Sequence, residues 1–407
     1  MMKAGATKSN GWVRGGMRWG TLAMGLLLTS VSAGAAQAGN VSAKISGGSL
    51  FLYGDRTDNT VLIESNASGQ IRVVGGVSGS GEATTINGSN APVDLQGWNN
   101  GIYAYLYEGN DSVTLLSGNV LGAVHLDLGA GEDDVVLGAS APELSEASLI
   151  EAILSGLLPA DPEVIAESGS LQLQRTLVVL GVQGNDQVTI SNTLVRGRTT
   201  LDLGGGNDNV FVGTVSDTNT TDFQDYLVIV PGSGQDAVLV NGVSVARDLL
   251  IDDPSDAADI GVFDTEVGQN LFVFSSLGAD NISINNVLVA SLAKVIAKEG
   301  DDYVSINNLM ANRMELFLGI GNDLFEGSGI MLDRLWTYLE SGDDRMDLSS
   351  SQVNTQFVYG AGGNDSITLS GCSGTDATVY GDGGNDTLST PANGIQNVRF
   401  YSIESRL

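Results

Sequence analysis

The segment SGDDRMDLSSSQVNTQFVYGAGGNDSITLS, Ser341–Ser370, holds the same short pattern twice. Each copy begins with Gly-x-Asp, ending at Asp344 and at Asp365, and continues as an alternation of polar and apolar residues. Because successive side chains of a β-strand point to opposite faces, this alternation predicts a strand with one buried face. The return of the pattern within so short a segment suggests an internal repeat.

The Gly-x-Asp pattern returns along most of the chain. Its aspartates are Asp111, Asp133, Asp186, Asp208, Asp236, Asp280, Asp302, Asp323, Asp344, Asp365 and Asp386. Successive spacings are 22, 53, 22, 28, 44, 22, 21, 21, 21 and 21, so the length of the repeat unit is 21 to 22. The spacing of 44 covers two units, and those of 53 and 28 contain insertions. The residue two positions after each aspartate is apolar, and a second apolar column follows two residues later except at Gly327 and Thr390.

A unit of this length has room for two or three short strands and their turns, but not for a strand with a crossover helix. Strands of successive units must therefore pair with their own copies. The sequence thus predicts an all-β fold, a right-handed parallel β-helix (a solenoid) in which each coil is one repeat unit. The hand follows the general preference of parallel crossovers. A β-sandwich is the structural alternative, but it leaves the fixed interval of the turn motif unexplained.

Four regions are predicted. Residues 1–38 have a basic start, an apolar run and a small-x-small end, as in a signal peptide. Residues 39–101 are expected to form an N-terminal cap and the first coils, and 102–390 the β-helix with its Gly-x-Asp turns. Residues 391–407 are expected to form a C-terminal cap. Within the β-helix, residues 141–168 have apolar residues at helical spacing, which predicts a short helical insertion that covers the sheet or binds a partner.

The charge of the chain limits its partners. The formal net charge is −30, and removing the four basic residues of the predicted signal peptide changes it to −34. Such a field repels nucleic acid and anionic lipid and attracts cations. No segment after residue 38 is apolar enough to span a membrane, so we expect a mature chain that is secreted or resides in the cell envelope. With one cysteine, Cys372, and one histidine, His125, the chain lacks the residues for an intrachain disulfide or a His/Cys zinc site.

The turn residues have two interpretations. Glycine and asparagine tolerate positive φ, and an aspartate can accept hydrogen bonds from nearby amides, so the motif fits a turn without a metal. Stacked coils, however, would place one aspartate above another, and unit charges about 4 Å apart repel by roughly 1 kcal/mol even in water. Calcium would compensate this repulsion, because it binds about six to eight oxygens of carboxylates and carbonyls.

Two turns resemble the haemolysin-type (RTX-like) calcium repeat, G-G-x-G-x-D-x-U-x, of secreted bacterial proteins. The matching residues are Gly360, Gly363, Asp365 and Ile367 in one turn, and Gly381, Gly384, Asp386 and Leu388 in the next. The resemblance implies Ca²⁺ as a cofactor, held between stacked turns by Asp365 and Asp386 together with turn carbonyls. It extends the same role to Asp344 and Asp323.

This chain departs from the repeat in two respects. Ala361 and Asp382 stand where the repeat has its second glycine. The family's roll also uses tandem nonapeptides, whereas this chain has one such turn per coil. The resemblance therefore implies calcium along at most one edge of the rod.

An aromatic column is predicted on the outer surface. Phe317, Tyr338, Tyr359 and Tyr380 occupy the same outward position in successive coils. Such a stripe could stack on the sugar rings of a polysaccharide. The alternative is an aromatic ladder that stabilises the sheet.

The charged residues leave an enzyme as the rival hypothesis. A polysaccharide lyase or hydrolase needs clustered carboxylates with a basic residue. Arg345 lies close to Asp347, and Arg196 and Arg198 could approach Asp202. Simple charge balance also explains these residues in so acidic a chain. We therefore expect an exported, non-enzymatic, calcium-binding β-helix that acts as a structural or adhesive protein and binds a polysaccharide or another envelope protein, with a polysaccharide-active enzyme as the alternative.

Overall fold

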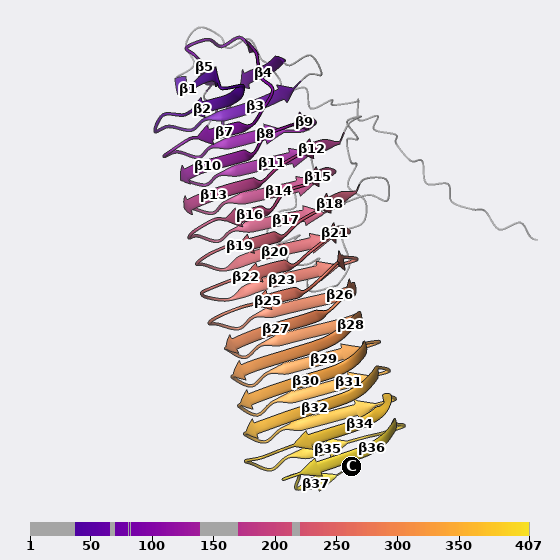
Figure 1. Cartoon of the computed structure of the whole chain (residues 1–407). Helices are drawn as coiled ribbons and strands as arrows, with labels where there is room; N and C mark the ends of the chain where they lie inside the picture. The colour runs from indigo at the N-terminus through magenta and orange to yellow at the C-terminus, as the bar shows by residue number, and fades with distance from the viewer. Residues whose placement is uncertain are drawn as a thin grey trace, which may run out of the picture.

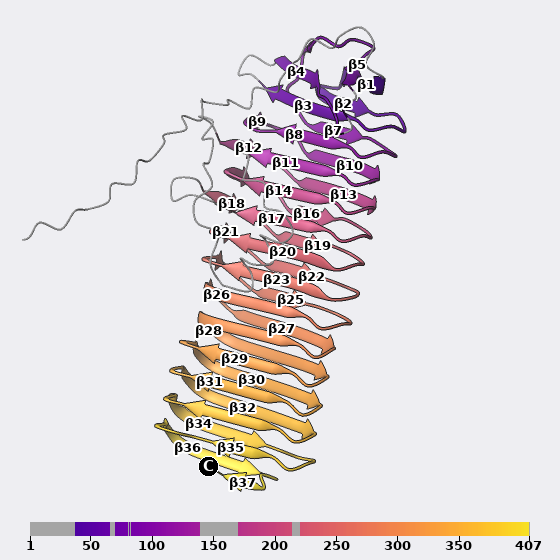
Figure 2. The ribbon, with the colours of Figure 1, turned by 180° about the vertical axis from the view of Figure 1, so that it is seen from behind.

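Parallel β-strands wind in successive coils from one end of a rod to the other (Figures 1 and 2). The structure is a computed structural model that describes residues 37–65, 70–79, 81, 83–138, 170–213 and 220–406. These residues form 37 strands and contain no helix. The predicted helical insertion, 141–168, lies outside the described residues, as do residues 1–36 of the predicted signal peptide.

The strands form three stacks, which we call stack A, stack B and stack C. Stack A leads into the Gly-x-Asp turn. Its strands are β2 (Ser49–Tyr53), β7 (Ile102–Tyr105), β10 (Val124–Ala130), β13 (Leu177–Gln183), β16 (Thr199–Asp202), β19 (Leu227–Val230), β22 (Leu249–Asp252), β25 (Leu271–Phe274), β27 (Leu292–Glu299), the end of β28 (Tyr303–Ile320), β30 (Met331–Ser341), β32 (Gln352–Gly362), β34 (Ser373–Tyr380) and β36 (Gly394–Tyr401).

Stack B follows the turn and stack C closes the coil. The strands of stack B are β3 (Thr60–Ser65), β8 (Ser112–Leu115), β11 (Asp134–Gly138), β14 (Gln187–Ser191), β17 (Asn209–Gly213), β20 (Asp236–Asn241), β23 (Ala258–Phe263), the starts of β26 (Asn281–Val289) and β28, β29 (Leu324–Ser328), β31 (Arg345–Ser349), β33 (Ser366–Ser370), β35 (Thr387–Ser389) and β37 (Ser405–Arg406). Stack C contains β9 (Gly118–Val120), β12 (Leu171–Leu173), β15 (Thr193–Val195), β18 (Thr221–Phe223), β21 (Val243–Val245) and β24 (Glu266–Val267), and it continues through parts of the longer strands from β26 onward.

The register of the stacks follows the sequence repeat. In stack B, Met346 lies opposite Ile367 and Leu348 opposite Leu369. Every strand in a stack pairs in parallel with the equivalent strand of the next coil, as β29 does with β31 and β31 with β33. The predicted parallel β-solenoid is therefore confirmed, and the β-sandwich alternative is wrong. The interval between repeats in the sequence is the length of one coil, because residues one repeat apart lie opposite each other.

The apolar columns meet inside the rod and form one continuous core. Ile367 and Leu388 of stack B are 1% and 0% exposed. Gly327, which interrupts its column in the sequence, leaves no void there. A methyl group on Gly327 would lie 2.9 Å from the ring of Phe325 and 2.8 Å from a methyl of Leu348. The larger side chain of Phe325 thus fills the volume that a leucine at position 327 would occupy.

The two ends of the rod differ. At the N-terminal end, β1 (Gln37–Ser46) pairs antiparallel with β2. There, β4 (Gln70–Gly75) pairs antiparallel with β3 and with β6 (Val93–Gln96), and β5 (Ala83–Ile86) pairs with β1. These pairings cover the first coil and interrupt its parallel edge. At the other end, Phe400 and Tyr401 of β36 are 39% and 49% exposed.

The glycine of each turn is required by the coil stacked on it. Gly342, Gly363 and Gly384 have φ of 146°, 138° and 147°, which favours glycine. A methyl group on any of them would lie 1.5 to 1.6 Å from the carbonyl oxygen of the equivalent glycine in the preceding coil. Ala361 and Asp382 adopt φ of 72° and 65°, a left-handed backbone conformation that is uncommon for residues other than glycine.

Replacement of one turn glycine should therefore destabilise the whole coil. We expect Gly342→Ala to lower the free energy of unfolding by roughly 2–4 kcal/mol, because the new methyl meets a rigid carbonyl oxygen at positive φ. Gly362→Ala is the matched control, since a methyl there has no neighbour within 4 Å. Urea denaturation of both variants measures the difference, and equal midpoints would contradict this explanation of the repeat.

Candidate functional site

A column of hydrogen-bonded aspartates runs through the Gly-x-Asp turns. Oδ1 of Asp344 accepts a hydrogen bond from the amide of Asp323 in the preceding coil at 2.8 Å, and Oδ1 of Asp365 accepts from the amide of Asp344 at 3.1 Å. Equivalent bonds join Asp111 to Asp236 through the aspartates between them, and Asp280 to Asp386 in the same way. At the last turn, Glu404 Oε2 accepts the amide of Asp386 at 2.8 Å. Each carboxylate thus binds a turn amide of the previous coil.

The middle residue of the turn forms a second column that runs in the opposite direction. Oδ1 of Asp343 accepts the amide of Asn364 in the next coil at 2.7 Å, and Oδ1 of Asn364 accepts the amide of Asn385 at 3.0 Å. This column lies at the exposed side of the turn. The frequent asparagine of the motif is therefore explained by hydrogen bonding between coils.

The aspartates of the first column are buried. Asp323, Asp344, Asp365 and Asp386 are 0–2% exposed. Their second carboxylate oxygen, Oδ2, is also buried and has no hydrogen-bond partner among the described residues. The same holds for Oδ2 of every other turn aspartate. A buried carboxylate oxygen without a partner is unfavourable, so these atoms call for a proton or a cation.

Burial raises the pKa of the turn aspartates from Asp111 to Asp365. Loss of hydration is the main cause, neighbouring carboxylates add to it, and the amide hydrogen bond opposes it. The pKa rises to about 8 for Asp186, to about 7 for Asp302 and Asp344, and to about 6 for Asp323 and Asp365. Protons therefore compete with cations for this column near neutral pH.

The donor atoms fit calcium only in part. The structure brings the predicted ligands Asp323, Asp344, Asp365 and Asp386 together in single file, one in each of four successive coils. The described residues contain no group of three or more His, Cys, Asp or Glu side chains that could hold a metal ion. Backbone carbonyls and water would thus have to complete the roughly six to eight oxygens that calcium prefers.

The four predicted glycine positions have identifiable structural roles. A methyl group on Gly360 or Gly381 would lie 2.3 or 2.2 Å from Oδ2 of Asp365 or Asp386, so these carboxylates rest directly on the glycine backbone. Gly363 and Gly384 allow the close stacking of the coils described above. The glycines therefore explain how the carboxylates become buried, with or without a metal.

The predicted aromatic column is a continuous ladder of stacked rings. The centroids of Phe317, Tyr338, Tyr359 and Tyr380 are 4.6 to 5.0 Å apart, with interplanar angles of 2–5°. Tyr401 extends the ladder by another ring, whose centroid lies 4.9 Å from that of Tyr380. The sequence repeat did not predict it, because the final coil lacks the Gly-x-Asp motif. Each ring covers the face of its neighbour, so ring edges and hydroxyl groups are what the column offers to a ligand.

The residues proposed for an enzyme are dispersed. Arg345 Nε donates to Oδ2 of Asp347 at 2.7 Å. Arg196 donates to Gln224 at 3.0 Å rather than approaching Asp202, which lies opposite Leu180 and Val230 in stack A. His125 packs beside the ring of Tyr105, with centroids 5.7 Å apart.

Comparisons of this chain with protein-family models, with curated proteins and with solved structures found no match. Among the described residues, no helix is long and apolar enough to cross a membrane.

The buried aspartates predict an unusual dependence of stability on pH. A carboxyl with a folded-state pKa above its unfolded value near 3.8 stabilises the fold below that unfolded value, and this contribution is lost as pH rises through the folded pKa. In the presence of a chelator we expect the free energy of unfolding to fall between about pH 4 and about pH 8. One pKa unit corresponds to about 1.4 kcal/mol, so a few groups suffice for a measurable loss.

Two variants test the source of this dependence by urea denaturation across that range. Asp186→Asn keeps an oxygen that can accept the amide of Asp133 but removes one titrating group, so the free energy of unfolding should fall less steeply with pH. Asp202→Asn, an exposed aspartate of stack A, should leave the profile unchanged. A wild-type stability that increases from about pH 4 to about pH 8 would contradict the prediction.

Proposed function

We propose that this protein is an exported, non-enzymatic β-solenoid that calcium stabilises along the turn edge and that binds polysaccharide with the outer surface of stack A. The column of buried, unpaired carboxylate oxygens supports the calcium part. The row of tyrosines at the coil interval supports the binding part. The leader-like sequence of residues 1–38 supports export to the cell envelope or the extracellular space.

The calcium proposal concerns the last four complete turns. Asp365 and Asp386, with Asp344 and Asp323 before them, would supply carboxylate oxygens, and the turn backbones would supply carbonyls. When bound, calcium neutralises neighbouring carboxylates and gives their second oxygens a partner. It would thereby replace the protons that the column takes up at lower pH.

Thermal unfolding with calcium and with a chelator tests this proposal. We expect calcium to raise the midpoint at about pH 8 and to have little effect at about pH 5, where the raised pKa values of Asp323, Asp344 and Asp365 keep these groups protonated. The double variant Asp365→Asn/Asp386→Asn should lose most of the response, whereas Asp202→Asn should keep it. Equal midpoints with calcium and chelator at about pH 8 would show that calcium plays no part.

The aromatic ladder is the observation that carries the binding proposal. Tyr338, Tyr359 and Tyr380 are partly exposed, and Tyr401 is 49% exposed. Their rings are stacked in register, so their side chains form a row that repeats at the spacing of the coils. A row of hydroxyl groups with a fixed repeat suits a polymer whose own hydroxyl groups repeat. Because the ring faces are covered, hydrogen bonds would contribute more to binding than stacking on sugar rings.

Removal of the hydroxyl groups alone tests the binding proposal. Tyr338→Phe/Tyr359→Phe keeps the stacked rings, and we expect it to weaken binding to a panel of immobilised polysaccharides by roughly two- to tenfold per hydroxyl. Tyr303→Phe, a change on stack B, is the control. Failure of the wild-type protein to bind any member of the panel, or unchanged binding by the double variant, would refute the proposal.

A further inference from the structure

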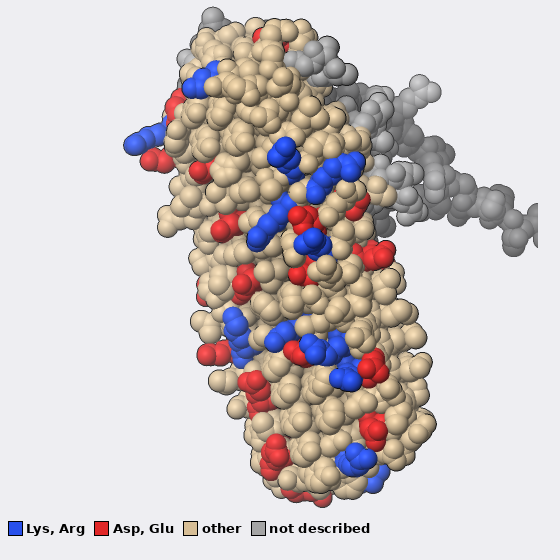
Figure 3. Space-filling view, in the orientation of Figure 1, with Lys and Arg blue, Asp and Glu red and all other residues tan. Residues whose placement is uncertain are grey.

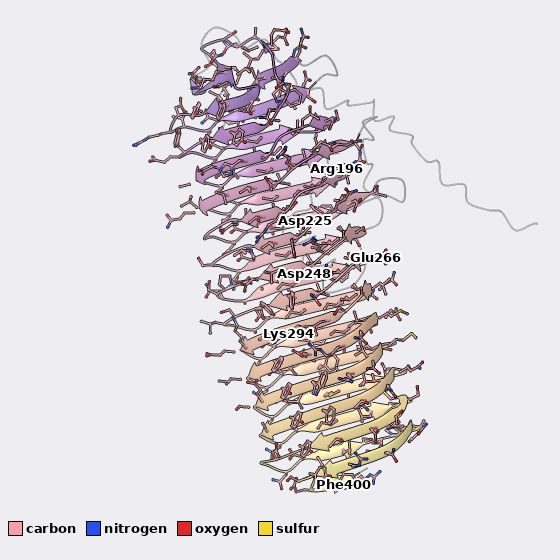
Figure 4. The ribbon with its side chains drawn as sticks, in the orientation of Figure 1. Arg196, Asp225, Asp248, Glu266, Lys294 and Phe400 are labelled. Carbon is pink, nitrogen blue, oxygen red and sulfur yellow. The ribbon has the colours of Figure 1, made fainter. Side chains whose placement is uncertain are left out.

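Lysine and arginine side chains gather in groups on one face of this acidic rod (Figure 3). An open groove of about 900 Å³ runs there along the edge between stack C and stack A. Its lining residues come from five successive coils, from the one that contains β7 to the one that contains β19. Figure 4 labels Arg196 and Asp225 in this part of the same face.

Two arginines of the groove have no counter-ion among the described residues. Arg175 and Arg198 lie in the same turn of neighbouring coils, just before β13 and β16, and both are exposed. Three other arginines of this face form ion pairs: Arg247 contacts Asp225 at 3.5 Å, Arg313 contacts Glu315 at 3.3 Å, and Arg399 contacts Asp376 at 3.3 Å. Arg196, which does not line the groove, donates to Gln224 at 3.0 Å. In a chain with 48 acidic and 18 basic residues, two adjacent arginines without a carboxylate partner are unexpected.

The groove exists because small residues stand at its floor. Gly197 occupies a turn position where the coils on both sides carry larger side chains, Arg175 and Asp225. Gly197 and Ala123 both line the groove. A methyl group on Gly197 would lie 2.6 Å from the backbone of Arg175, so the coils approach closely there. The hollow between the two arginines and Asp225 is therefore part of the fold.

The other residues that line the groove indicate which further chemical groups a ligand would have. Tyr103 stacks one face on Phe51, with centroids 5.1 Å apart, and it lines the groove together with Leu121, which is 50% exposed. Asn100 and Gln174 add amide groups. Guanidinium groups suit carboxylates, an aromatic and an aliphatic side chain suit the apolar face of a sugar, and amides suit its hydroxyl groups.

We propose that this groove binds a carboxylated saccharide, with the carboxylate held by Arg175 and Arg198 and the sugar ring placed against Tyr103 and Leu121. Its volume is that of a ligand site for one or a few sugar units. The acidic net charge does not prevent this, because charges farther away than about 8 Å are largely screened at physiological ionic strength. The site is separate from the aromatic ladder, so the inference stands or falls independently of the proposed function.

Calorimetry on the full mature chain tests the inference with three probes of equal length: an oligomer of galacturonic acid, its methyl ester and a sulfated oligosaccharide. The buffer contains a chelator, because carboxylated sugars bind calcium themselves. We expect the uronate to bind more tightly than both other probes, and raised salt to weaken its binding. Replacement of either arginine by alanine should weaken uronate binding by about tenfold or more.

Controls separate the site from general charge and from the ladder. Arg399→Ala removes an arginine of the same face and should leave uronate binding unchanged, as should Tyr338→Phe/Tyr359→Phe. An unchanged thermal midpoint of the Arg175→Ala and Arg198→Ala variants shows that they remain folded. Equal binding of uronate and methyl ester, equal or tighter binding of the sulfated probe, absence of uronate binding, or full binding by the arginine variants would each overturn the inference.

Discussion

The hydrogen bond from a turn amide to the aspartate of the next coil is the interaction on which this fold depends. It satisfies a backbone donor that would otherwise be buried without a partner, and it fixes the distance and register between coils. The glycine of the motif follows from it, since the coils approach so closely that a methyl group on Gly342 would collide with Gly321. The middle residue follows as well, because Asn364 links the exposed side of the same turns.

This interaction has an electrostatic cost. Each carboxylate that bonds an amide through Oδ1 carries Oδ2 into the interior, where the described residues offer no donor. One such carboxylate could be tolerated through protonation alone. A column of them couples the stability of the rod to whatever neutralises it, and protons and calcium are the two candidates that the chemistry of the site suggests.

The outer surface follows the same repeat, because each coil contributes one residue to each outward column. A residue type repeated in one outward position becomes a stripe, as the ladder from Phe317 to Tyr401 illustrates. A position that varies between coils instead produces a local site. At the edge between stacks C and A, small residues lie beside Arg175 and Arg198, so a groove and two arginines without a counter-ion among the described residues occur in one place. The solenoid can therefore carry a repetitive surface and a discrete pocket on the same face.

The sequence by itself determined the solenoid. The interval between the aspartates is the coil length, the apolar columns are the core, and the residues that face each other in β31 and β33 are those that the repeat aligns. These features are predictable because each coil buries the same positions and pairs with its own copy. The positions of the metal candidates and of the aromatic column along the rod were predictable for the same reason.

Only the tertiary structure decided how those side chains are used. The turn aspartates lie inside the coil edge because their rotamer is set by amides of the neighbouring coil, which no single repeat contains. The rings of the tyrosine ladder stack because adjacent coils hold them close together, with the centroids of Tyr359 and Tyr380 lying 5.0 Å apart. Each ring therefore covers the face of the next. The groove at Arg175 and Arg198 joins residues from five coils and has no motif, since it depends on which side chains are small as much as on which are charged.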